Sequence, residues 1–365
     1  MDDVKRALRI GIDARAAAEV AAGTGRVARE LLRALAERED AHTYRCYARR
    51  PWGALGTRFE WQIVGLQDPW WHLRVAQLAR NECDVFLSAN SFLTMCFLTV
   101  PAVPIVYDLV TFDPAMSPNR RSLMVERLTL GRAVRRAAAI VAISESTERA
   151  LIDRFPRATG KVTVAPLGAS PTLQDDVPAD ELAALPQGGF VLAVGTLEPR
   201  KNLPRLAEAY AELPDPVRRQ HPLVVAGKLG WQTGPTRDAL ASLGSDCIQL
   251  GYVSDGALGE LYRRCALFCY PSLGEGFGLP VLEAMAAGAP VLTSNVSSLP
   301  EVGGEAVAYC DPWSTESIAD ELAALLADPA RRTRLRKAGR ARAATFTWSR
   351  TAAVVVDTLE RAATL

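Results

Sequence analysis

The sequence predicts an α/β protein built from two doubly wound, Rossmann-like domains. Short apolar runs alternate with longer amphipathic stretches along the whole chain, which is typical of parallel sheets covered by helices on both faces. The chain has 365 residues, more than a single hydrophobic core usually supports. A polar segment punctuated by proline lies over 170–189 and separates two parts of similar length. We therefore expect one domain on each side, with ligands bound in a cleft at the carboxyl ends of the strands.

The first part of the chain contains six short apolar runs that we interpret as strands. They are Leu8–Asp13, Ile63–Leu66, Val85–Ser88, Ile105–Tyr107, Ala139–Ile143 and Val162–Ala165. Helical periodicity follows the first run over Arg26–Glu37 and returns over Arg121–Ala137. We therefore expect residues 1–169 to form the first domain.

The second part repeats this alternation. Its predicted strands are Phe190–Gly195, Leu223–Ala226, Ile248–Leu250, Leu267–Tyr270, Pro290–Thr293 and Val307–Tyr309. Helical patterns lie between and after them, at Leu203–Tyr210, Leu258–Cys265 and Glu316–Ala327. We expect residues 190–347 to form the second domain, and residues 348–365 to form a terminal helix whose position in space the pattern does not give.

Composition excludes several classes of protein. The 42 Lys and Arg residues nearly balance the 41 Asp and Glu residues, which argues against a dedicated nucleic-acid-binding protein. No apolar run approaches the roughly 18 residues of a membrane span, and the charged N-terminus does not resemble a signal peptide. We interpret the seven cysteines as reduced core residues of a cytoplasmic protein. His42, His72 and His221 do not cluster, so we expect no metal site and no cofactor.

The densest group of candidate functional residues lies between Tyr270 and Gly288. A buried strand ends there at a proline, a loop with glycines at 274, 276 and 278 follows, and Pro280 stands where a helix would begin. The glycines allow a ligand to approach the backbone closely. The amide groups near Gly278 and Leu279 would point out of the helix N-terminus, which favours a phosphate.

Two glutamates in this segment, Glu275 and Glu283, have seven residues between them. Glu275 lies in the predicted loop and Glu283 about one turn into the predicted helix. Because a carboxylate accepts hydrogen bonds from neighbouring hydroxyl groups, the pair suits a sugar and a ribose. The alternative is a glycine-rich turn carrying two solvated glutamates.

As a whole, the segment resembles the Glu-x7-Glu signature of retaining glycosyltransferases of family 4, which have the two-domain GT-B fold. Further stretches resemble this family in order and spacing: Gly11–Arg15, Gly23–Arg26, Ile143–Ser146, Val194–Leu203, Val225–Lys228, Leu250–Asp255 and Leu299–Val302. The resemblance implies that the terminal helix packs back on the first domain. It also implies transfer of a sugar from a nucleotide sugar to a glycan or a polyprenyl-linked glycan. The strings look most like those of bacterial polysaccharide mannosyltransferases, so GDP-mannose is the first donor to test, with UDP-glucose, UDP-N-acetylglucosamine and a dTDP-6-deoxysugar as alternatives.

The resemblance also implies a set of donor-binding residues in the second domain. Lys201 would neutralise the diphosphate, Glu275 would bind the donor sugar, Glu283 would bind the ribose, and Val253 would meet the base. Many family members carry an arginine where this chain has Thr196, so one expected cation is missing, and Arg200 is the residue that could compensate. The remaining donor-binding residues are Gly227, Lys228, Gly276, Phe277, Gly278 and Leu279. The family's retention of configuration is ascribed to a front-face reaction rather than to a side-chain nucleophile.

The acceptor side is less clearly encoded. Tyr107 and Asp108 stand where the family often has a histidine and an aspartate. Asp108 would contact the acceptor or handle a proton, and we name it with Glu275 and Lys201 as catalytic. Tyr107 is a poor base at neutral pH, and an ordinary strand residue is the alternative for it. The resemblance also places a loop over Gly23, Thr24 and Gly25 on the phosphate or acceptor side.

The predicted helix over Arg120–Arg136 alternates arginines with apolar residues. Such a helix can lie on anionic lipid, which would make the protein peripheral on the inner face of the cell membrane. It can equally pack against the core and expose a basic face to solvent.

Two other functions remain as alternatives. A Rossmann-type oxidoreductase shares the fold class, but no G-x-G-x-x-G follows the first strand. A non-catalytic protein that binds nucleotide sugars is the other alternative. The presence of Glu275, Glu283 and Lys201 argues against it.

Overall fold

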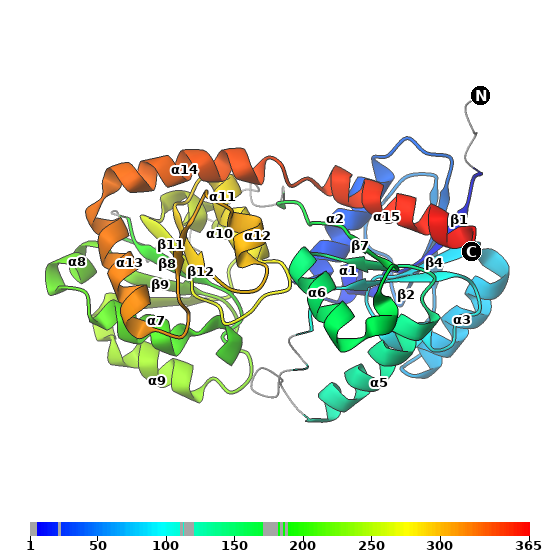
Figure 1. The fold of residues 1–365 in the computed structure, drawn as a ribbon, viewed down its shortest axis with the longest axis horizontal. Coiled ribbons are helices and arrows are strands. Elements are labelled where there is room, and N and C mark those ends of the chain that lie inside the picture. The colour runs from blue at the N-terminus through cyan, green and yellow to red at the C-terminus, as the bar shows by residue number, and fades with distance from the viewer. Residues whose placement is uncertain are drawn as a thin grey trace. The chain divides into compact units, whose positions relative to one another are not determined.

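The computed structural model describes residues 6–20, 23–109, 112, 120–170, 182, 185–186 and 189–365, without the side chains of 120–123 and 125–126. Most of the linker predicted over 170–189 lies outside the described residues. The chain forms two compact units, coloured in chain order in Figure 1. Unit 1 comprises Met1–Gly168 and Thr347–Leu365, and unit 2 comprises Ala169–Phe346.

Within the described residues, unit 1 has one parallel sheet of seven strands in the order β3-β2-β1-β4-β5-β6-β7. The strands are β1 Arg9–Asp13, β2 Thr43–Ala48, β3 Phe59–Ile63, β4 Val85–Ser88, β5 Ala102–Val106, β6 Ile140–Ala142 and β7 Val162–Val164. The helices of this unit are α1 Arg15–Glu19, α2 Thr24–Ala36, α3 Trp70–Glu82, α4 Phe92–Met95, α5 Arg120–Arg136, α6 Glu145–Arg154 and α15 Trp348–Ala363. The predicted class, a doubly wound parallel sheet, is confirmed for this unit.

The edge of this sheet differs from the prediction. The strand expected at Ile63–Leu66 is wrong, because β3 covers Phe59–Ile63 and ends where that apolar run begins. The neighbouring strand β2 was not predicted. Both strands carry polar side chains, and β3 is only half-buried because it lies at the sheet edge. Continuous apolar runs mark central strands, and edge strands do not show them.

The terminal helix α15 belongs to unit 1, where it packs against α2 and the strands β4–β7. The Thr351 hydroxyl donates to the Pro166 carbonyl over 2.5 Å, and His42 Nε2 lies 3.1 Å from Glu360 Oε1. Figure 1 shows this helix, in red, beside elements from the blue and green parts of the chain. Across the described residues, no helix is both long enough and apolar enough to span a membrane.

Unit 2 has, in its described residues, a parallel sheet of six strands in the order β10-β9-β8-β11-β12-β13. The strands are β8 Val191–Val194, β9 Leu223–Ala226, β10 Cys247–Gly251, β11 Leu267–Tyr270, β12 Val291–Ser294 and β13 Ala308–Cys310. After β8 the chain continues to β9 on one side of the sheet, and after β11 it continues to β12 on the other side. The strand order therefore reverses between β8 and β11. Such a reversal opens a crevice at the carboxyl ends of the two strands, where ligands bind in this class of sheet.

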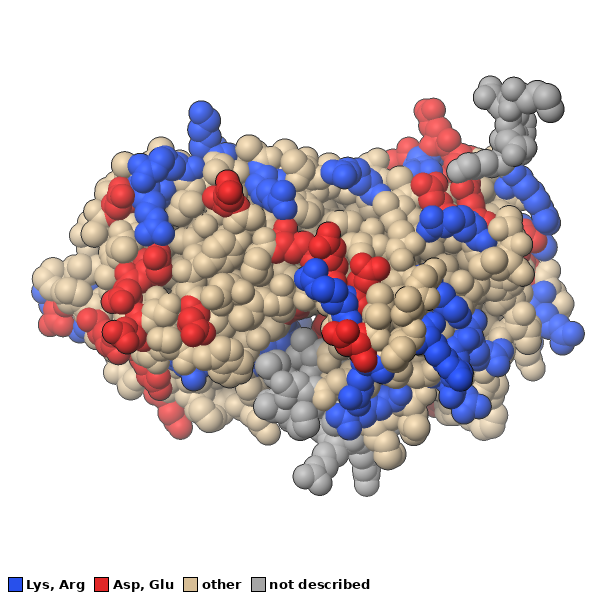
Figure 2. Space-filling model, in the orientation of Figure 1, with Lys and Arg blue, Asp and Glu red and all other residues tan. Residues whose placement is uncertain are grey.

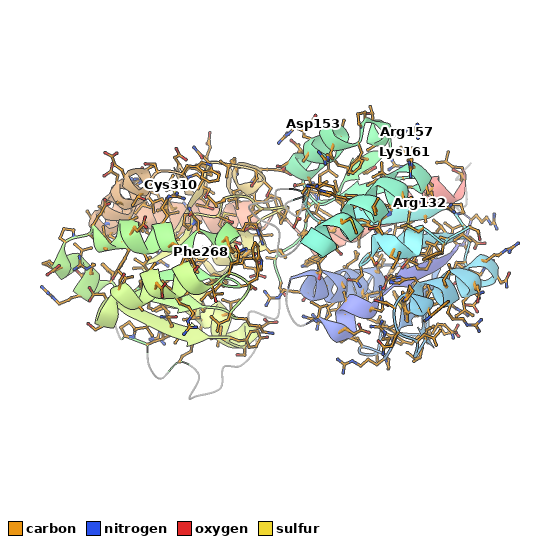
Figure 3. All side chains as sticks on the ribbon, turned by 90° about the horizontal axis from the view of Figure 1, so that it is seen from below. Arg132, Asp153, Arg157, Lys161, Phe268 and Cys310 are labelled. Atoms are coloured by element: carbon orange, nitrogen blue, oxygen red, sulfur yellow. The ribbon has the colours of Figure 1, made fainter. Side chains whose placement is uncertain are left out.

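Helices cover both faces of the second sheet. They are α7 Leu203–Ala211, α8 Asp215–Gln220, α9 Gly234–Ser242, α10 Asp255–Arg264, α11 Leu279–Ala287, α12 Leu299–Gly303, α13 Thr315–Ala327 and α14 Pro329–Ala343. Cys310 belongs to the core cluster formed with α7 and α13. Phe268 instead stacks edge-on with Tyr262 of α10, with ring centroids 5.2 Å apart. Figure 3 labels Phe268 and Cys310 within this unit.

Arginines of α14 bind the C-terminal ends of other helices in unit 2. Arg336 donates to the carbonyl oxygens of Cys265 and Gly288, each over 2.9 Å, where α10 and α11 end. Arg342 donates to Glu301 and Val302 near the end of α12. Guanidinium groups at these positions satisfy terminal carbonyls and complement the helix dipoles. Helix α11, which carries Glu283, is therefore fixed at its C-terminal end.

Candidate active site

Lys201 and Glu275 meet at the point where the strand order of unit 2 reverses. Lys201 ends a short 3-10 turn, Pro199–Lys201, in the loop after β8, and Glu275 lies in the loop between β11 and α11. Lys201 Nζ donates to Glu275 Oε1 over 2.8 Å. Only 10% of the lysine side chain and 9% of the glutamate side chain are exposed. The two catalytic residues predicted for this unit thus form a buried ion pair.

The Glu275 carboxylate accepts hydrogen bonds from four side chains. Besides Lys201, its Oε1 atom accepts from the Tyr270 and Ser272 hydroxyl groups, each over 2.7 Å. Its Oε2 atom accepts from Nη1 of Arg200. Lys201 Nζ also donates to the Tyr270 hydroxyl over 2.5 Å and lies 4.9 Å from the centre of its ring. Tyr270 therefore bridges the cation and the carboxylate.

These charges and the burial of the site shift the pKa values of Glu275 and Lys201. Burial opposes ionisation of Glu275, but the positive charges of Lys201 and Arg200 outweigh it and lower the pKa of this carboxyl group to about 2. Burial lowers the pKa of Lys201 below its usual value, while Glu275 acts in the opposite direction. Arg200 Nη2 also donates to Glu198 Oε1 over 2.7 Å. Two cations and two carboxylates thus balance one another in a cluster with no net charge.

Backbone and amide hydrogen bonds hold the two loops together. The Arg200 carbonyl accepts from the Leu273 amide over 2.9 Å and from the Ser272 hydroxyl over 3.0 Å. Asn202, with φ of 59°, donates through Nδ2 to the carbonyls of Pro271 and Pro312. Asparagine adopts this left-handed conformation more readily than most residues. The loop after β8 is therefore fixed to the loop after β11.

The loop after β11 leads into α11 as predicted. The helix begins at Leu279, with Pro280 in its first turn and Gly278 before it at φ of 101°. A Cβ atom at Gly278 would lie 2.7 Å from Leu299 Cδ2, so this position needs glycine for both backbone and space. Glu283 follows on the helix and is 2% exposed. Neither glutamate is solvated, which removes that alternative for both.

Gly276 and Phe277 complete the predicted donor loop. Both are buried, and the Phe277 ring packs edge-on against Phe346, with ring centroids 5.9 Å apart. The Glu275 amide donates to the Ser297 hydroxyl, and the Ser298 hydroxyl donates to the Glu275 carbonyl, both over 2.9 Å. The loop before α12 therefore supports the backbone of the loop after β11.

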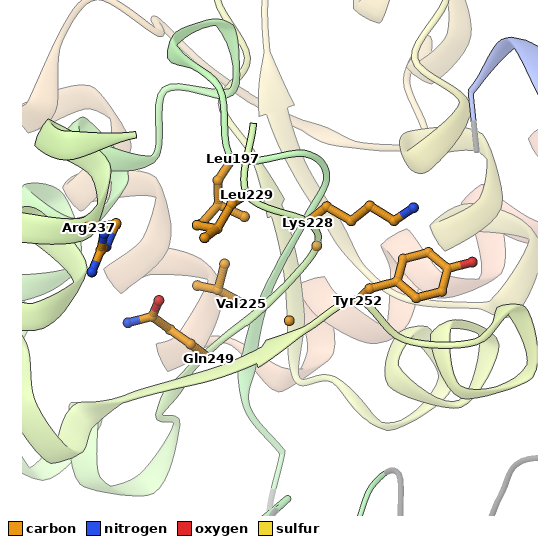
Figure 4. A pocket seen from close by; sticks show the side chains of 9 residues that line it. Leu197, Val225, Lys228, Leu229, Arg237, Gln249 and Tyr252 are labelled. Carbon is orange, nitrogen blue, oxygen red and sulfur yellow. The ribbon is translucent and has the colours of Figure 1, made fainter. Parts of the chain in front are cut away.

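A pocket of about 530 Å³ lies at the carboxyl ends of β8, β9 and β10 (Figure 4). It is lined by Leu197, Val225, Gly227, Lys228, Leu229, Arg237, Gln249, Gly251 and Tyr252. Lys228 Nζ lies 4.6 Å from the centre of the Tyr252 ring, and Figure 4 shows the two side chains extending together. The predicted donor residues Gly227 and Lys228 are thus pocket residues, while Val253 is buried directly after the pocket residue Tyr252 and Thr196 is exposed.

The backbone conformation of Gly227 allows three loops of the pocket wall to lie close together. Its φ is 154°, and a Cβ atom there would lie 1.9 Å from the Gly195 carbonyl oxygen. Its amide donates to the Gly251 carbonyl over 2.7 Å. The loops after β8, β9 and β10 therefore leave the sheet in close contact, which only glycine at 227 permits.

The residues predicted for the acceptor side lie in unit 1. Tyr107 follows β5 and donates its hydroxyl proton to the Ala89 carbonyl over 2.7 Å. Burial, and then the charge of Asp13, raise the pKa of Tyr107, so it does not act as a base near neutral pH. Asp108 is half-buried directly after it.

The predicted glycine loop of unit 1 opens a helix. Gly23 precedes α2 with φ of 57°, and Thr24 and Gly25 form its first turn. A Cβ atom at Gly25 would lie 1.8 Å from the Val20 carbonyl oxygen. Close packing of α2 on the end of α1 accounts for glycine at this position.

Sequence reasoning assigned no role to a buried ion pair at the end of β1. Arg15 donates to both Asp13 carboxylate oxygens, over 3.2 and 3.1 Å, and to Asp68 over 3.1 Å. Its guanidinium lies 3.7 Å from the centre of the Trp71 ring. The side chains of Asp13 and Arg15 are 0% and 5% exposed. The sequence signal was the pair of opposite charges at the end of an apolar strand, where burial forces them to pair.

Four further site residues of unit 2 were also missed: Glu198, Asn202, Tyr270 and Ser272. All four stand within the motifs that revealed Lys201 and Glu275, but their roles depend on contacts between the loops. In the part of the chain that the structure describes, no group of three or more His, Cys, Asp or Glu residues could hold a metal ion.

The family model described as glycosyl transferases group 1 matches residues 180–342, and that of glycosyltransferase family 4 matches residues 21–173. The O-antigen chain mannosyltransferase B of Escherichia coli is 34% identical over 259 residues, which cover 68% of this chain and 67% of that protein. The serotype-specific mannosyltransferase WbdA of Escherichia coli is 34% identical over 254 residues, and the match spans 67% of this chain but 31% of WbdA.

Solved structures with the same fold are more distant in sequence. The sucrose-phosphate synthase of Thermosynechococcus elongatus aligns with a TM-score of 0.76 at 19% identity, covering 96% of this chain and 98% of that one. The Anabaena protein HepE in complex with UDP-glucose aligns with a TM-score of 0.76 at 18% identity, covering 96% and 99%. At this identity the alignments establish the fold.

Proposed function

Because this chain belongs to the group 1 and family 4 glycosyltransferases, we propose that it transfers a hexose from a nucleotide sugar to a glycan or lipid-linked glycan. The fold is GT-B, as the sequence predicts. The observation that carries the proposal is the buried cluster of Arg200, Lys201 and Glu275 beside the start of α11. It combines cations, a hydroxyl-binding carboxylate and a helix N-terminus at the crevice of a doubly wound sheet.

Each of these groups has a defined task in the proposed reaction. Lys201 and Arg200 neutralise the charge that develops on the leaving diphosphate, and the N-terminal amides of α11 assist them. Glu275 accepts hydrogen bonds from donor sugar hydroxyls, and Glu283 accepts them from the ribose. Charge neutralisation is thereby supplied by side chains, and we infer that the reaction is independent of metal ions.

We infer that the reaction retains the anomeric configuration. The bond from the anomeric carbon to the diphosphate breaks, the acceptor hydroxyl oxygen bonds to the same face, and its proton passes to the leaving phosphate oxygen. Glu275 is engaged by four hydrogen-bond donors, which suits positioning rather than nucleophilic attack. Asp108 of unit 1 is the residue we assign to the acceptor.

GDP-mannose is the donor we propose. The support is that the relatives O-antigen chain mannosyltransferase B and WbdA are named as mannosyltransferases. The structures aligned above include a complex with UDP-glucose, so a uridine donor is the comparison that the experiment must include.

A surface of α5 supports contact with anionic lipid. Met124 and Leu128 are 58% and 66% exposed, and Arg132, Arg135 and Arg136 are exposed on the same helix. Figure 2 shows Lys and Arg side chains gathered over the part of unit 1 where α5 lies. Figure 3 labels Arg132 there, together with Arg157 and Lys161 near the end of the helix. Exposed apolar side chains flanked by arginines suit the interface of a charged membrane.

One assay tests the proposal. The purified chain is incubated with GDP-mannose, UDP-glucose or UDP-N-acetylglucosamine, with and without EDTA, and release of nucleoside diphosphate is followed. We expect release from GDP-mannose above the other donors, unchanged by EDTA, and abolished in Lys201→Ala. A protein that only binds nucleotide sugars would show saturable binding without release, and an oxidoreductase would show neither. Restoration of EDTA-treated enzyme by magnesium or manganese would contradict the metal-independent reaction.

A further inference from the structure

We propose that Glu275 makes the site discriminate between a sugar-bearing donor and the bare nucleoside diphosphate, by holding Lys201 and Arg200 until sugar hydroxyls replace these cations as its partners. The inference rests on the proposed function. It adds a second task to a residue that would otherwise serve only to bind the donor sugar. It concerns the state of the site before the donor binds and after the product has formed.

The charged groups of the cluster already pair with one another. Both oxygens of the Glu275 carboxylate are engaged, and its two cationic partners are the groups proposed to receive the diphosphate. Glu198 pairs with Arg200 on the other side. Since the four formal charges cancel, the cluster offers an incoming diphosphate no excess positive charge. A diphosphate gains these cations only by displacing Glu275 from them.

The displacement costs more for the bare nucleotide than for the donor. Once the cations move to the diphosphate, Glu275 keeps the hydroxyl groups of Tyr270 and Ser272 and remains a buried carboxylate beside an anion. A sugar supplies hydroxyl groups that donate to the freed oxygen atoms. A bare nucleoside diphosphate has no such donors at that position, so the carboxylate is left with too few hydrogen bonds. Discrimination here comes from a penalty against the wrong ligand.

Tyr270 allows Lys201 and Glu275 to exchange partners, because its side chain contacts both residues. Its hydroxyl accepts from Lys201 and donates to Glu275, and its ring lies under the lysine ammonium. Lys201 and Glu275 therefore each keep the Tyr270 hydroxyl as a partner when the direct ion pair between them opens. After transfer, loss of the sugar restores the competition by Glu275, which favours release of the nucleoside diphosphate.

Calorimetric titration of GDP and GDP-mannose, with UDP in parallel, tests the inference on wild type, Glu275→Gln and Glu283→Gln. We expect Glu275→Gln to bind GDP about fivefold to tenfold tighter than wild type, the range of one ordinary hydrogen bond. Its affinity for GDP-mannose should rise less or fall, since the sugar contacts are weakened. Glu283→Gln is the matched control and should bind GDP more weakly, because this glutamate is assigned to the ribose.

The outcomes separate the inference from the proposed function. If wild type binds GDP and Glu275→Gln binds it equally or more weakly, the inference is wrong and the proposed function stands. If neither wild type nor Glu275→Gln binds any of GDP, UDP and GDP-mannose, the proposed function is wrong and the inference falls with it. Glu275→Ala gives the same sign if the glutamine variant does not fold, and thermal unfolding identifies the folded variants.

Discussion

Lys201 and Glu275 are 74 positions apart in the chain, yet Lys201 Nζ lies 2.8 Å from Glu275 Oε1 in a site from which water is largely excluded. The pair spans the reversal of strand order in the sheet of unit 2. A buried charge without its partner is unfavourable, so each residue depends on the other for stability as well as for chemistry.

Removal of either charge should abolish most transfer. We expect Glu275→Gln and Lys201→Ala each to lower kcat at least about 100-fold, since each acts where charge develops or the sugar is bound. Lys201→Ala should also lower the free energy of unfolding by about 1–3 kcal/mol, because a buried carboxylate loses a donor. Steady-state kinetics and urea unfolding measure both effects. A variant within threefold of wild-type turnover would refute its assigned role.

Tyr270→Phe removes the bridging hydroxyl and keeps the ring under the Lys201 ammonium. We expect about a tenfold loss of kcat with a smaller change in KM, since the variant loosens the catalytic pair without removing a charge. Tyr210→Phe is the matched control, because Tyr210 is also fully buried in unit 2 and its hydroxyl donates to the Arg218 and His221 carbonyls rather than to the cluster. Equal kinetic effects of the two variants would contradict the positioning role of Tyr270.

The free energy of unfolding should fall as the pH is lowered from 4.5 towards 2, because Glu275 becomes protonated over this range. Its pKa is depressed from 4.5 to about 2 in the folded protein, so the stabilisation is complete above 4.5 and is lost as the pH falls towards 2. The effect is on the order of 3 kcal/mol. The free energy of urea unfolding, measured at several pH values in this window, should fall less steeply for Glu275→Gln than for wild type. Parallel curves would show that Glu275 does not contribute.

Arg336→Ala should destabilise unit 2 without altering the chemistry. The variant leaves the terminal carbonyls of α10 and α11 without this guanidinium, and we expect a loss of about 1–3 kcal/mol in the free energy of unfolding. Lys337→Ala is the control, because Lys337 is exposed on the same helix, and its effect should stay within about 0.5 kcal/mol. Equal stability of the two variants would show that the capping interactions contribute nothing measurable.

The proposed contact of α5 with anionic lipid can be tested with vesicles. We expect the chain to sediment with vesicles containing phosphatidylglycerol, to remain in solution with phosphatidylcholine alone, and to dissociate as salt is raised. Leu128→Asp combined with Arg132→Glu should abolish sedimentation. Arg334→Glu, which makes the same arginine-to-glutamate change at an exposed position of unit 2, should leave it intact. Binding that persists in the α5 variant would assign the membrane contact to another surface.

The sequence by itself determined the central strands and pointed to the candidate site residues that the structure brings together in unit 2. β4, β9 and β11 coincide with the predicted Val85–Ser88, Leu223–Ala226 and Leu267–Tyr270, because strands buried on both faces must be apolar throughout. Lys201, Glu275 and Glu283 were recognisable because glycines, prolines and charges follow strand ends at short range, where local spacing fixes local geometry. The edge strand β3 was misplaced because solvent on one side relaxes that requirement.

Only the tertiary structure decided which of these residues act together. The pairing of Lys201 with Glu275, the contact of Lys201 with Tyr270, and the contact of Arg15 with Trp71 all join segments far apart in the chain. A sequence pattern reports neighbours within a few residues. Pairing across a sheet depends on strand order and on the exclusion of water, which arise only when the strands assemble. The neutral charge cluster, and with it the competition for the diphosphate, is therefore a property of the fold.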